Sequence, residues 1–501
     1  MNSFVKGTIF LMVVIFISKL LGFVFRMQFM RIAGEEVVGL YMTSYPTFIF
    51  FISLVQLGIP IAMSKLVAGY FAKGQYAHIE AVYRVTFRVS LVAIILFIPI
   101  LALCTPFIAT ALLHNEKITY TLLVGLVAVP FVIISSLYKA YLQGVTQITP
   151  TAWAQLFEQC IRIGLTMLLL PFFISPNEPA QTAAYAMGIT LLGEIFSLLF
   201  LRFYVARMKR KLRAQSIVQV ARKPIFNIAL PAAGSKLFGS FTWFLEPIIF
   251  LKALTVAGLT AGYATTLYGV ISGVHIPLLL FPAFIPAALA IVLIPAVSDA
   301  VARHNKTLLN NRIELSLRLS SIVGCIAATI FYLHGDELAG ALFHLEENRG
   351  YMKILAPIFY FYYIQSPLHS ILQAVDEGRV AMLNSMYGGI GKLFILFVLA
   401  SQPFIQEKGA IIAIGFGVLI TSFLHIASIR QHKQIAIGFR IFLMPYALFI
   451  LMCVMQPLLT RSMSLPIEIT MSLTFLTLLL LITKQLRLSD LHILRSIFTR
   501  L

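Results

Sequence analysis

The sequence predicts an all-α polytopic membrane protein, with about fourteen transmembrane helices arranged as two pseudo-symmetric six-helix lobes plus two C-terminal helices. Three observations predict this fold class. Hydrophobic residues fill 59% of the 501 positions and charged residues only 11%, whereas soluble domains have roughly 45–50% and 25%. The apolar residues gather in stretches that are long enough to cross a bilayer, and short motifs of the first half return in the second half.

The individual spans follow from length, since a helix needs about 20 apolar residues to cross the hydrocarbon core. The first apolar stretch is too long and too charged for a cleaved signal peptide, so we expect it to stay in the mature chain. The predicted spans are residues 6–31, 39–63, 86–112, 119–142, 152–175, 182–205, 227–251, 266–296, 316–334, 352–374, 381–401, 409–429, 441–460 and 466–484.

Basic residues alternate between the loops that join these spans. If the N-terminus is cytoplasmic, the cytoplasmic loops carry Lys65, Lys139 and the dense run 207–223, while the other loops are acidic or poor in cations, as at Glu35 and Glu36. Because cytoplasmic loops carry the excess of Lys and Arg, we predict a multi-pass protein of the cell membrane with both termini cytoplasmic. Topology and contact with anionic lipid also explain the net charge of +19, so no nucleic-acid partner is expected.

An internal repeat relates the two halves. Residues 142–145 (Leu-Gln-Gly-Val) match 372–375 (Leu-Gln-Ala-Val), and Arg162 matches Lys392 at the same offset. Six spans separate the copies, and an even number preserves topology, so we predict parallel lobes with the substrate between them near the midplane. The predicted divisions are an N-lobe at 1–206, a basic cytoplasmic linker at 207–226, a C-lobe at 227–430, and two appended helices with a cytoplasmic tail at 431–501.

Basic side chains inside apolar spans are the first candidate site residues. Lys19 and Arg26 are seven positions apart and share one helix face, and the Ser-Lys motif returns at Lys236. Because buried ionisable residues usually mark a substrate path, we expect these three to line an aqueous cavity, with Glu246 balancing charge or binding a coupling cation. In the structural alternative the lysines snorkel to the interface and Arg26 pairs with a loop carboxylate.

Further ionisable residues lie in the later spans. Glu158 and Arg162 have the spacing of an intrahelical ion pair, which is structural or lines the cavity. Lys392 has no acid one turn before it, so we expect it to face the cavity or another helix. Glu194 and His275 are candidates for titration or substrate contact, and satisfied packing partners are the alternative. Prolines in the second, seventh and eighth spans predict kinks.

The function class follows from these charges and from the motifs that are missing. The four cysteines have no metal or redox spacing, and the sequence has no Walker loop, nucleotide fingerprint or nucleophile elbow. We therefore expect a transporter with no catalytic residue, metal or cofactor, whose basic cavity suits a substrate with anionic phosphates. Two alternatives stay open: an ion-coupled multidrug or small-molecule exporter, and a non-transporting scaffold for wall-synthesis enzymes.

A family resemblance adds to this interpretation and covers essentially the whole chain. The motifs that carry it are Ser18–Phe23 followed by Gly34–Tyr41, Ser64–Ala68, Tyr141–Gly144 with Glu158 and Arg162, and Gly234–Lys236 with Trp243 and Glu246. With them the sequence resembles the stage V sporulation protein B branch of the polysaccharide exporter family, in the MOP flippase superfamily that also contains MurJ lipid II flippases and MATE exporters. The resemblance implies a MATE/MurJ-like bundle.

The resemblance also implies a function. It is that of a flippase that moves an undecaprenyl-diphosphate-linked, lipid II-like cell-wall precursor across the cytoplasmic membrane by alternating access, in spore formers during synthesis of cortex peptidoglycan. Membrane lipids and peptidoglycan synthases are the partners that this role suggests.

Residue by residue, the carry-over from the lipid II flippases is partial. Lys19 stands at the position of one of their first-helix arginines, and Arg26 lies next to a second. Residues 50–52 are apolar where those flippases carry another arginine, and Gln56 lies near their glutamate. In the eighth span only His275 lies in the region of a further arginine. The match therefore implies a lipid-linked saccharide in general.

Overall fold

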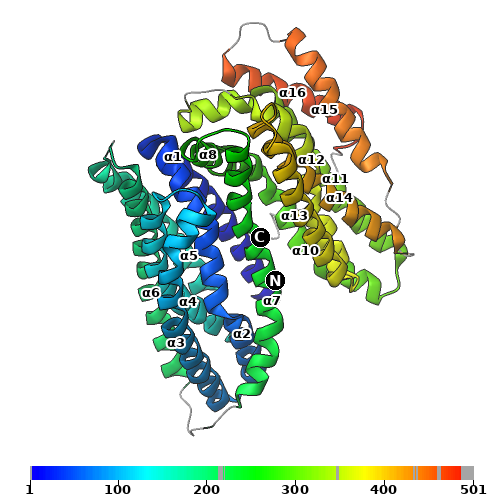
Figure 1. Cartoon of the computed structure of the whole chain (residues 1–501). Coiled ribbons are helices and arrows are strands. Elements are labelled where there is room, and N and C mark those ends of the chain that lie inside the picture. The colour runs from blue at the N-terminus through cyan, green and yellow to red at the C-terminus, as the bar shows by residue number, and fades with distance from the viewer. Residues whose placement is uncertain are drawn as a thin grey trace. The chain divides into compact units, whose positions relative to one another are not determined.

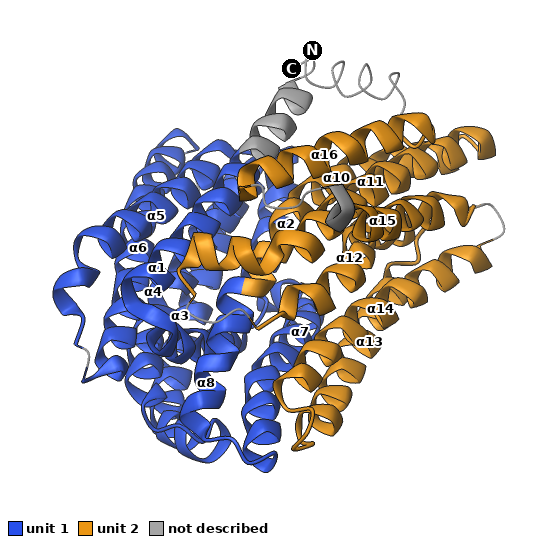
Figure 2. Ribbon diagram, turned by 90° about the horizontal axis from the view of Figure 1, so that it is seen from above, with its two compact units in different colours: residues 1–274 blue, residues 275–501 orange. Residues whose placement is uncertain are grey.

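The computed structural model describes residues 3–175, 177–212, 218, 221–345, 349–432, 435, 438–459 and 464–486. All the regular secondary structure within these ranges is helical. Two compact units divide the chain, Met1–Val274 and His275–Leu501 (Figure 2).

The first unit contains the helices up to α8 (Figure 1). Its elements are α1 (Ser3–Gln56), α2 (Ile59–Ala72), α3 (Tyr76–Phe107) with the π-helical turn Ile108–Leu112, α4 (Ile118–Gly144), α5 (Thr149–Leu168) with the 3-10 turn Leu170–Phe173, α6 (Pro179–Lys211), α7 (Arg222–Val256) and α8 (Ala261–Val270).

The second unit contains the remaining helices. A π-helical turn, Ile271–His275, leads into it from the first unit. Its elements are α9 (Ile276–Leu280), the 3-10 turn Phe281–Ala283, α10 (Phe284–Ala302), α11 (Lys306–Phe343), α12 (Tyr351–Ala374), α13 (Gly378–Ala400), α14 (Glu407–Gln431), α15 (Arg440–Leu459) and α16 (Leu465–Ile482).

Every predicted span overlaps helix in the structure. The first predicted span lies in α1, where the chain bends at Gly34, which has φ 79° and ψ 173°. The second predicted span begins in α1 and ends in α2. A positive φ of this kind is easy for glycine and costly for other residues. Ten of the described helical segments are long and apolar enough to cross a membrane, which confirms the predicted all-α polytopic membrane fold.

The predicted proline kinks have different outcomes. Helix α1 continues through Pro46 and α7 continues through Pro247. The eighth span, by contrast, is broken into α8, α9 and α10, with Pro277 in the first turn of α9 and Pro282 in the 3-10 turn that follows. Proline lacks the amide hydrogen of a helical bond, and π-helical turns often occur at functional sites. Proline and helix breaks coincide in the eighth span, and in the second span α2 starts with Pro60 in its first turn, directly after the end of α1.

The compact units and the predicted lobes divide the chain at different points. Helix α7 packs against α1 and α2, and α8 packs against α1, so the compact first unit extends to Val274 rather than ending near residue 206. The predicted lobes concern the sequence repeat and stay a prediction. Residues 213–217 and 219–220 of the predicted linker, and the tail from residue 487, lie outside the described residues.

Small residues bring the helices of the first unit together. A Cβ atom on Gly39 of α1 would lie 2.7 Å from the carbonyl oxygen of Thr265, and one on Gly269 of α8 would lie 2.3 Å from the Cα of Gly39. Lipid is as apolar as the helices, so close packing and hydrogen bonds, rather than hydrophobic burial, hold helices together in a membrane. The Gly39–Gly269 crossing thus fixes α8 on α1.

Candidate functional site

A cluster of charged side chains lies between α4, α5 and α6 of the first unit. Nη2 of Arg162 donates to Oε1 of Glu158 over 2.7 Å, and Nζ of Lys139 lies 3.8 Å from Oε2 of the same carboxylate. Glu158 is 7% and Arg162 9% exposed. The Glu158–Arg162 contact is the intrahelical pair that the spacing predicts.

Glu194 of α6 completes this group, which we call the carboxylate cluster (Lys139, Glu158, Arg162, Glu194). Its carboxyl group interacts electrostatically with the other three side chains. Gly193 permits the approach of α6 to α5, since a Cβ atom there would lie 3.4 Å from the Glu158 carbonyl oxygen. Two carboxylates therefore face two cations in the interior of the unit.

Arg26 of α1 lies next to this cluster. Its guanidinium interacts electrostatically with Arg162 and with the phenol groups of Tyr41 and Tyr45. Its Nη1 donates to the carbonyl oxygen of Ser272, in the π-helical turn, over 3.1 Å. Arg26 is half-buried, so a basic side chain from the first predicted span adds to the positive charge beside the cluster.

Aromatic and hydroxyl groups surround these arginines. The guanidinium of Arg162 lies 5.6 Å from the ring centroid of Phe25. Tyr41 shares a 3.0 Å hydrogen bond between its phenol oxygen and Oγ1 of Thr190, and Tyr45 contacts Trp243 of α7 edge to face at 5.9 Å. Aromatic faces and hydroxyl groups stabilise cations without neutralising them.

A second polar group, which we call the amide chain (Lys236, Gln56, Ser136), joins α7, α1 and α4. Nζ of Lys236 donates to Oε1 of Gln56 over 2.5 Å, and Nε2 of Gln56 donates to Oγ of Ser136 over 2.8 Å. Gln56 is buried, whereas Lys236 is exposed on the unit. The predicted site residue Lys236 is therefore held by an uncharged partner.

The other predicted residues of the first unit lie apart from these contacts. Lys19 has an exposed side chain on α1. Glu246 of α7 is half-buried and interacts electrostatically with Tyr268 of α8. The structure thus brings Arg26, Glu158, Arg162 and Glu194 together, and it gives Lys19 and Glu246 separate surroundings.

Two predicted residues belong to the second unit. His275 is 2% exposed, lies 4.0 Å from Oδ1 of Asp336, and contacts the ring of Tyr351 at 5.2 Å. The same carboxylate accepts a 3.3 Å hydrogen bond from the amide of Met352. Lys392 is half-buried where α13 crosses α14, since a Cβ atom on Gly417 would lie 2.9 Å from the Lys392 Cβ. His275 therefore has packing partners within its unit.

Several residues of the site were missed at the level of sequence. The alternation of basic loops predicts a loop position for Lys139, but the residue lies within α4 and contacts Glu158. The signal in the sequence is its place inside the predicted span 119–142, which groups it with the cations inside apolar spans. Gln56 and Ser136 are uncharged, and nothing in one sequence marks them as partners of Lys236.

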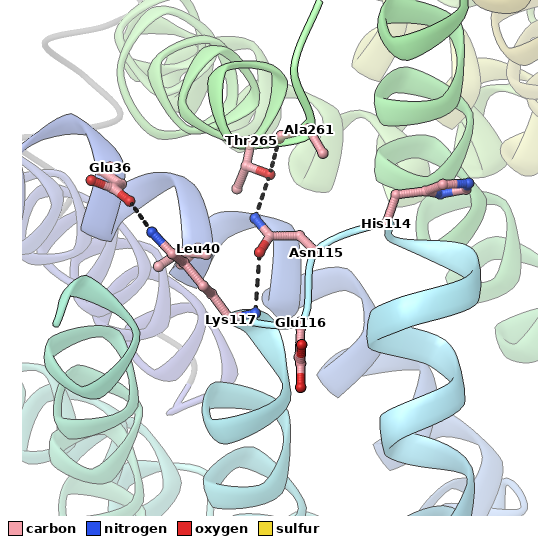
Figure 3. Close-up of a pocket in the computed structure, with 9 residues that line it drawn as sticks. Glu36, Leu40, His114, Asn115, Glu116, Lys117, Ala261 and Thr265 are labelled. Atoms are coloured by element: carbon pink, nitrogen blue, oxygen red, sulfur yellow. Dashed lines mark hydrogen bonds and ion pairs between the residues drawn. The ribbon is translucent and has the colours of Figure 1, made fainter.

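A pocket of about 270 Å³ lies at the end of the first unit where α1 bends. Nζ of Lys117 lies 2.9 Å from Glu36, and Nδ2 of Asn115 donates to Oγ1 of Thr265 over 3.0 Å. In Figure 3 these side chains point toward one another, while His114 and Glu116 point away from them. The contacts tie the segment before α4 to α1 and α8. Across the described ranges, no three His, Cys, Asp or Glu side chains are grouped to hold a metal ion.

Comparisons with known proteins agree with this fold. A family model described as "Polysaccharide biosynthesis protein" matches residues 4–301. Stage V sporulation protein B of Bacillus subtilis (strain 168) is 32% identical over 457 residues, covering 90% of this chain and 88% of that protein. Lipid II flippase MurJ of the same strain is 24% identical over 461 residues, covering 86% and 83%.

Solved structures extend the likeness to three dimensions. A lipid II flippase MurJ in an inward closed conformation has a TM-score of 0.70 at 14% identity, covering 98% of this chain and 99% of that chain. An inward-facing MATE family transporter of the MOP superfamily has a TM-score of 0.67 at 13% identity, covering 83% and 96%. The predicted MATE/MurJ-like fold is confirmed, and the chain is a multi-pass membrane protein of the flippase and transporter class.

Proposed function

Because the chain belongs to the polysaccharide biosynthesis protein family, we propose that it is a flippase for an undecaprenyl-diphosphate-linked, lipid II-like cell-wall saccharide. It moves this lipid across the cytoplasmic membrane by alternating access, with both of its own termini in the cytoplasm. The name of its sporulation relative and the activity in the name of its MurJ relative support this proposal. The pathway served is synthesis of the spore cortex peptidoglycan.

The observation that carries the proposal is the set of cations inside the apolar first unit. Arg26, Lys139 and Arg162 lie in helices that are apolar enough to cross a membrane or in α5 packed among them. A charged side chain at the centre of a bilayer costs roughly 2.5–3.5 kcal/mol on insertion scales, so such residues are kept for function. Phosphate oxygens are strong acceptors for hydrogen bonds from Arg and Lys, so these cations are suited to bind a diphosphate group.

The proposed roles of these residues differ with the exposure of their side chains. Lys19 and Lys236 have exposed side chains, so they are the first contacts for the diphosphate. Arg26 follows, with Arg162 behind it, and the carboxylates Glu158, Glu194 and Glu246 balance charge when no substrate is bound. Lys392 and His275 of the second unit stay candidate contacts for later steps of the cycle.

The charge balance disfavours export of cationic drugs. Lys19, Arg26, Lys139, Arg162 and Lys236 outnumber Glu158, Glu194 and Glu246 in the first unit, whereas a site for cationic drugs requires a net acidic lining. A non-transporting scaffold would gain nothing from charges inside apolar helices, because they cost free energy without a ligand.

Reconstitution tests the proposal. Liposomes containing the protein and fluorescent lipid II are assayed for flipping with wild type, Lys19→Ala, Arg26→Ala and, as control, Lys73→Ala, which removes an exposed cation at the end of α2. We expect wild type and the control to flip alike, and Arg26→Ala to flip at least about tenfold more slowly, the value of one charge-assisted hydrogen bond. No flipping by wild type overturns the proposed substrate, and equal flipping by all four proteins overturns the diphosphate grip.

A further inference from the structure

The chain breaks at the residue that contacts Lys236. Gln56 is the last residue of α1, and it is followed by Leu57 with φ 48° and Gly58 with φ 67° before α2 begins. Two consecutive left-handed residues end the helix abruptly. For a bulky residue such as leucine this conformation is a genuine outlier, and such outliers persist where the surrounding structure requires them, often at ligand sites.

Helix α7 requires this break. A Cβ atom on Gly58 would lie 2.3 Å from the carbonyl oxygen of Ala229 and 2.8 Å from the amide nitrogen of Ala233. The backbone of α7 therefore touches the break directly, and only glycine fits between the two. Lys236 follows Ala233 by three residues, so it lies on the same face of α7, one turn further along. The close contact holds the base of Lys236 against the end of α1.

The hydrogen bonds at the break run in one direction. An ammonium group can only donate, so Lys236 must donate to Oε1 of Gln56, and the amide then presents its NH₂ group to Ser136. The hydroxyl of Ser136 is already committed, because it donates to the carbonyl oxygen of Ile133 over 2.7 Å. Each donor and acceptor thus has its role fixed, and the amide of Gln56 cannot turn over without placing its NH₂ group against the ammonium.

From this geometry we propose that Gln56 is a positioning residue for anion capture. Together with Ser136 it holds the ammonium group of Lys236 in place without neutralising its charge, so that Lys236 can donate a hydrogen bond to a phosphate oxygen of a prenyl diphosphate. The inference rests on the proposed function, and it assigns a role to an uncharged side chain. A carboxylate at position 56 would hold the lysine as well, but it would cancel the charge that attracts the substrate.

A purely structural role for Gln56 predicts a different behaviour. In a purely structural role, Gln56 only provides hydrogen bonds for buried polar groups. A substitution that disturbs these hydrogen bonds then lowers the melting temperature, and the affinity for the diphosphate falls together with it. If Gln56 holds Lys236 while leaving its positive charge uncompensated, Gln56→Glu separates the two properties. The ion pair that the introduced carboxylate forms with Lys236 keeps or raises the melting temperature, while the affinity for a diphosphate falls.

The binding experiment uses the protein's own tryptophan. The chain has two tryptophans, and Trp243 lies two turns beyond Lys236 on the same helix. In a Trp153→Phe background, the fluorescence of Trp243 is titrated with farnesyl diphosphate, and with farnesol as the uncharged probe. The variants are Gln56→Glu, Gln56→Met, Ser136→Ala and Lys236→Ala. Gln181→Glu, which places the same charge change on an exposed residue at the start of α6, is the matched control.

We expect Gln56→Glu to weaken farnesyl diphosphate binding by about tenfold with no effect on farnesol and no loss of melting temperature. Gln56→Met and Ser136→Ala weaken diphosphate binding about threefold, because the hydrogen bonds that fix the position of the ammonium group are lost or loosened. In a Lys236→Ala background, Gln56→Glu has a much smaller effect, as a double-mutant cycle reveals. Gln181→Glu binds as the background protein does.

The outcomes separate the inference from the proposed function. If Lys236→Ala weakens diphosphate binding but Gln56→Glu does not, the role of Gln56 is overturned and the function stands. If Gln56→Glu fails to fold, Ser136→Ala decides: unchanged diphosphate affinity in that variant overturns the inference. If Lys236→Ala binds farnesyl diphosphate as the background protein does, or the background protein binds none, the diphosphate grip of the proposed function is itself overturned.

Discussion

The first unit contains two contacts in which a basic side chain is bound by a buried partner, and the two partners differ in charge. In the carboxylate cluster, Arg162 is bound by Glu158 over 2.7 Å and both are nearly buried. In the amide chain, Lys236 is bound by the neutral side chain of Gln56 over 2.5 Å. The first contact pairs a cation with an anion, and the second leaves the cation with its full charge.

The partner's charge determines whether the cation mainly stabilises the fold or stays available to bind a phosphate. A buried ion pair is expensive to break, because removing one partner leaves the other charge without compensation. A neutral acceptor competes only weakly with a phosphate for an ammonium group, since the phosphate adds its own negative charge to the hydrogen bond. Arg162 is therefore suited to a resting state in which its charge is balanced, whereas Lys236 is suited to capture.

The largest effect is expected from Glu158→Gln. This substitution replaces the carboxylate that both Arg162 and Lys139 contact with a neutral amide, and it leaves Glu194 as the remaining carboxylate of the cluster. Breaking a buried pair costs about 3–5 kcal/mol of folding free energy, so the melting temperature in detergent should fall sharply. Glu178→Gln, which changes an exposed carboxylate before α6, is the control and should melt as wild type does. A wild-type melting temperature for Glu158→Gln would contradict the tight pairing.

A double substitution tests whether the pair also has a function. Replacing Glu158 and Arg162 together by leucine removes both charges, and such replacements are often neutral or stabilising by about 1–4 kcal/mol. We expect the melting temperature to recover while flipping of lipid II in liposomes stays at least about tenfold below wild type. Recovery of both properties would assign the pair to structure alone, and the cation of the amide chain would then carry the substrate contact.

How much of this site could be predicted depends on the range of each contact. The Glu158–Arg162 pair follows from four-residue spacing on one helix, and the apolar spans follow from length and composition. The contact of Lys236 with Gln56 joins residues 180 positions apart. It also requires the left-handed break at Leu57 and Gly58, and Gly58 is the only sign of this break in the sequence. Tertiary packing, rather than any local pattern, determines that contact.

His275 illustrates the same limit in the second unit. Its place in an apolar span made it a candidate for substrate contact, and the resemblance placed it near an arginine position. The structure shows it 2% exposed beside Asp336 and Tyr351, two residues of α11 and α12 that no spacing rule connects to it. Its part in transport stays a prediction, and its packing environment could be learned only from the fold.

A smaller effect is expected from Arg26→Lys. The substitution keeps the positive charge beside Tyr41, Tyr45 and Arg162 but removes the planar guanidinium that donates to the Ser272 carbonyl oxygen. Arg and Lys are not interchangeable where two donors are used at once, so we expect flipping to fall about three- to tenfold, less than for Arg26→Ala. Equal rates for the two variants, measured in the same liposome assay, would mean that charge alone is insufficient and the fork of donors is essential.

The smallest effect is expected from Ser136→Ala. The hydroxyl of Ser136 accepts from Gln56 and is the far end of the amide chain, so its loss leaves the Lys236–Gln56 hydrogen bond but removes the second contact that holds the amide in place. A single neutral hydrogen bond contributes about 0.5–1.5 kcal/mol, and the melting temperature should fall by only a few degrees. A fall as large as that of Glu158→Gln, in the same thermal assay, would erase the contrast between the two contacts, because the amide chain would then be as costly to break as a buried ion pair.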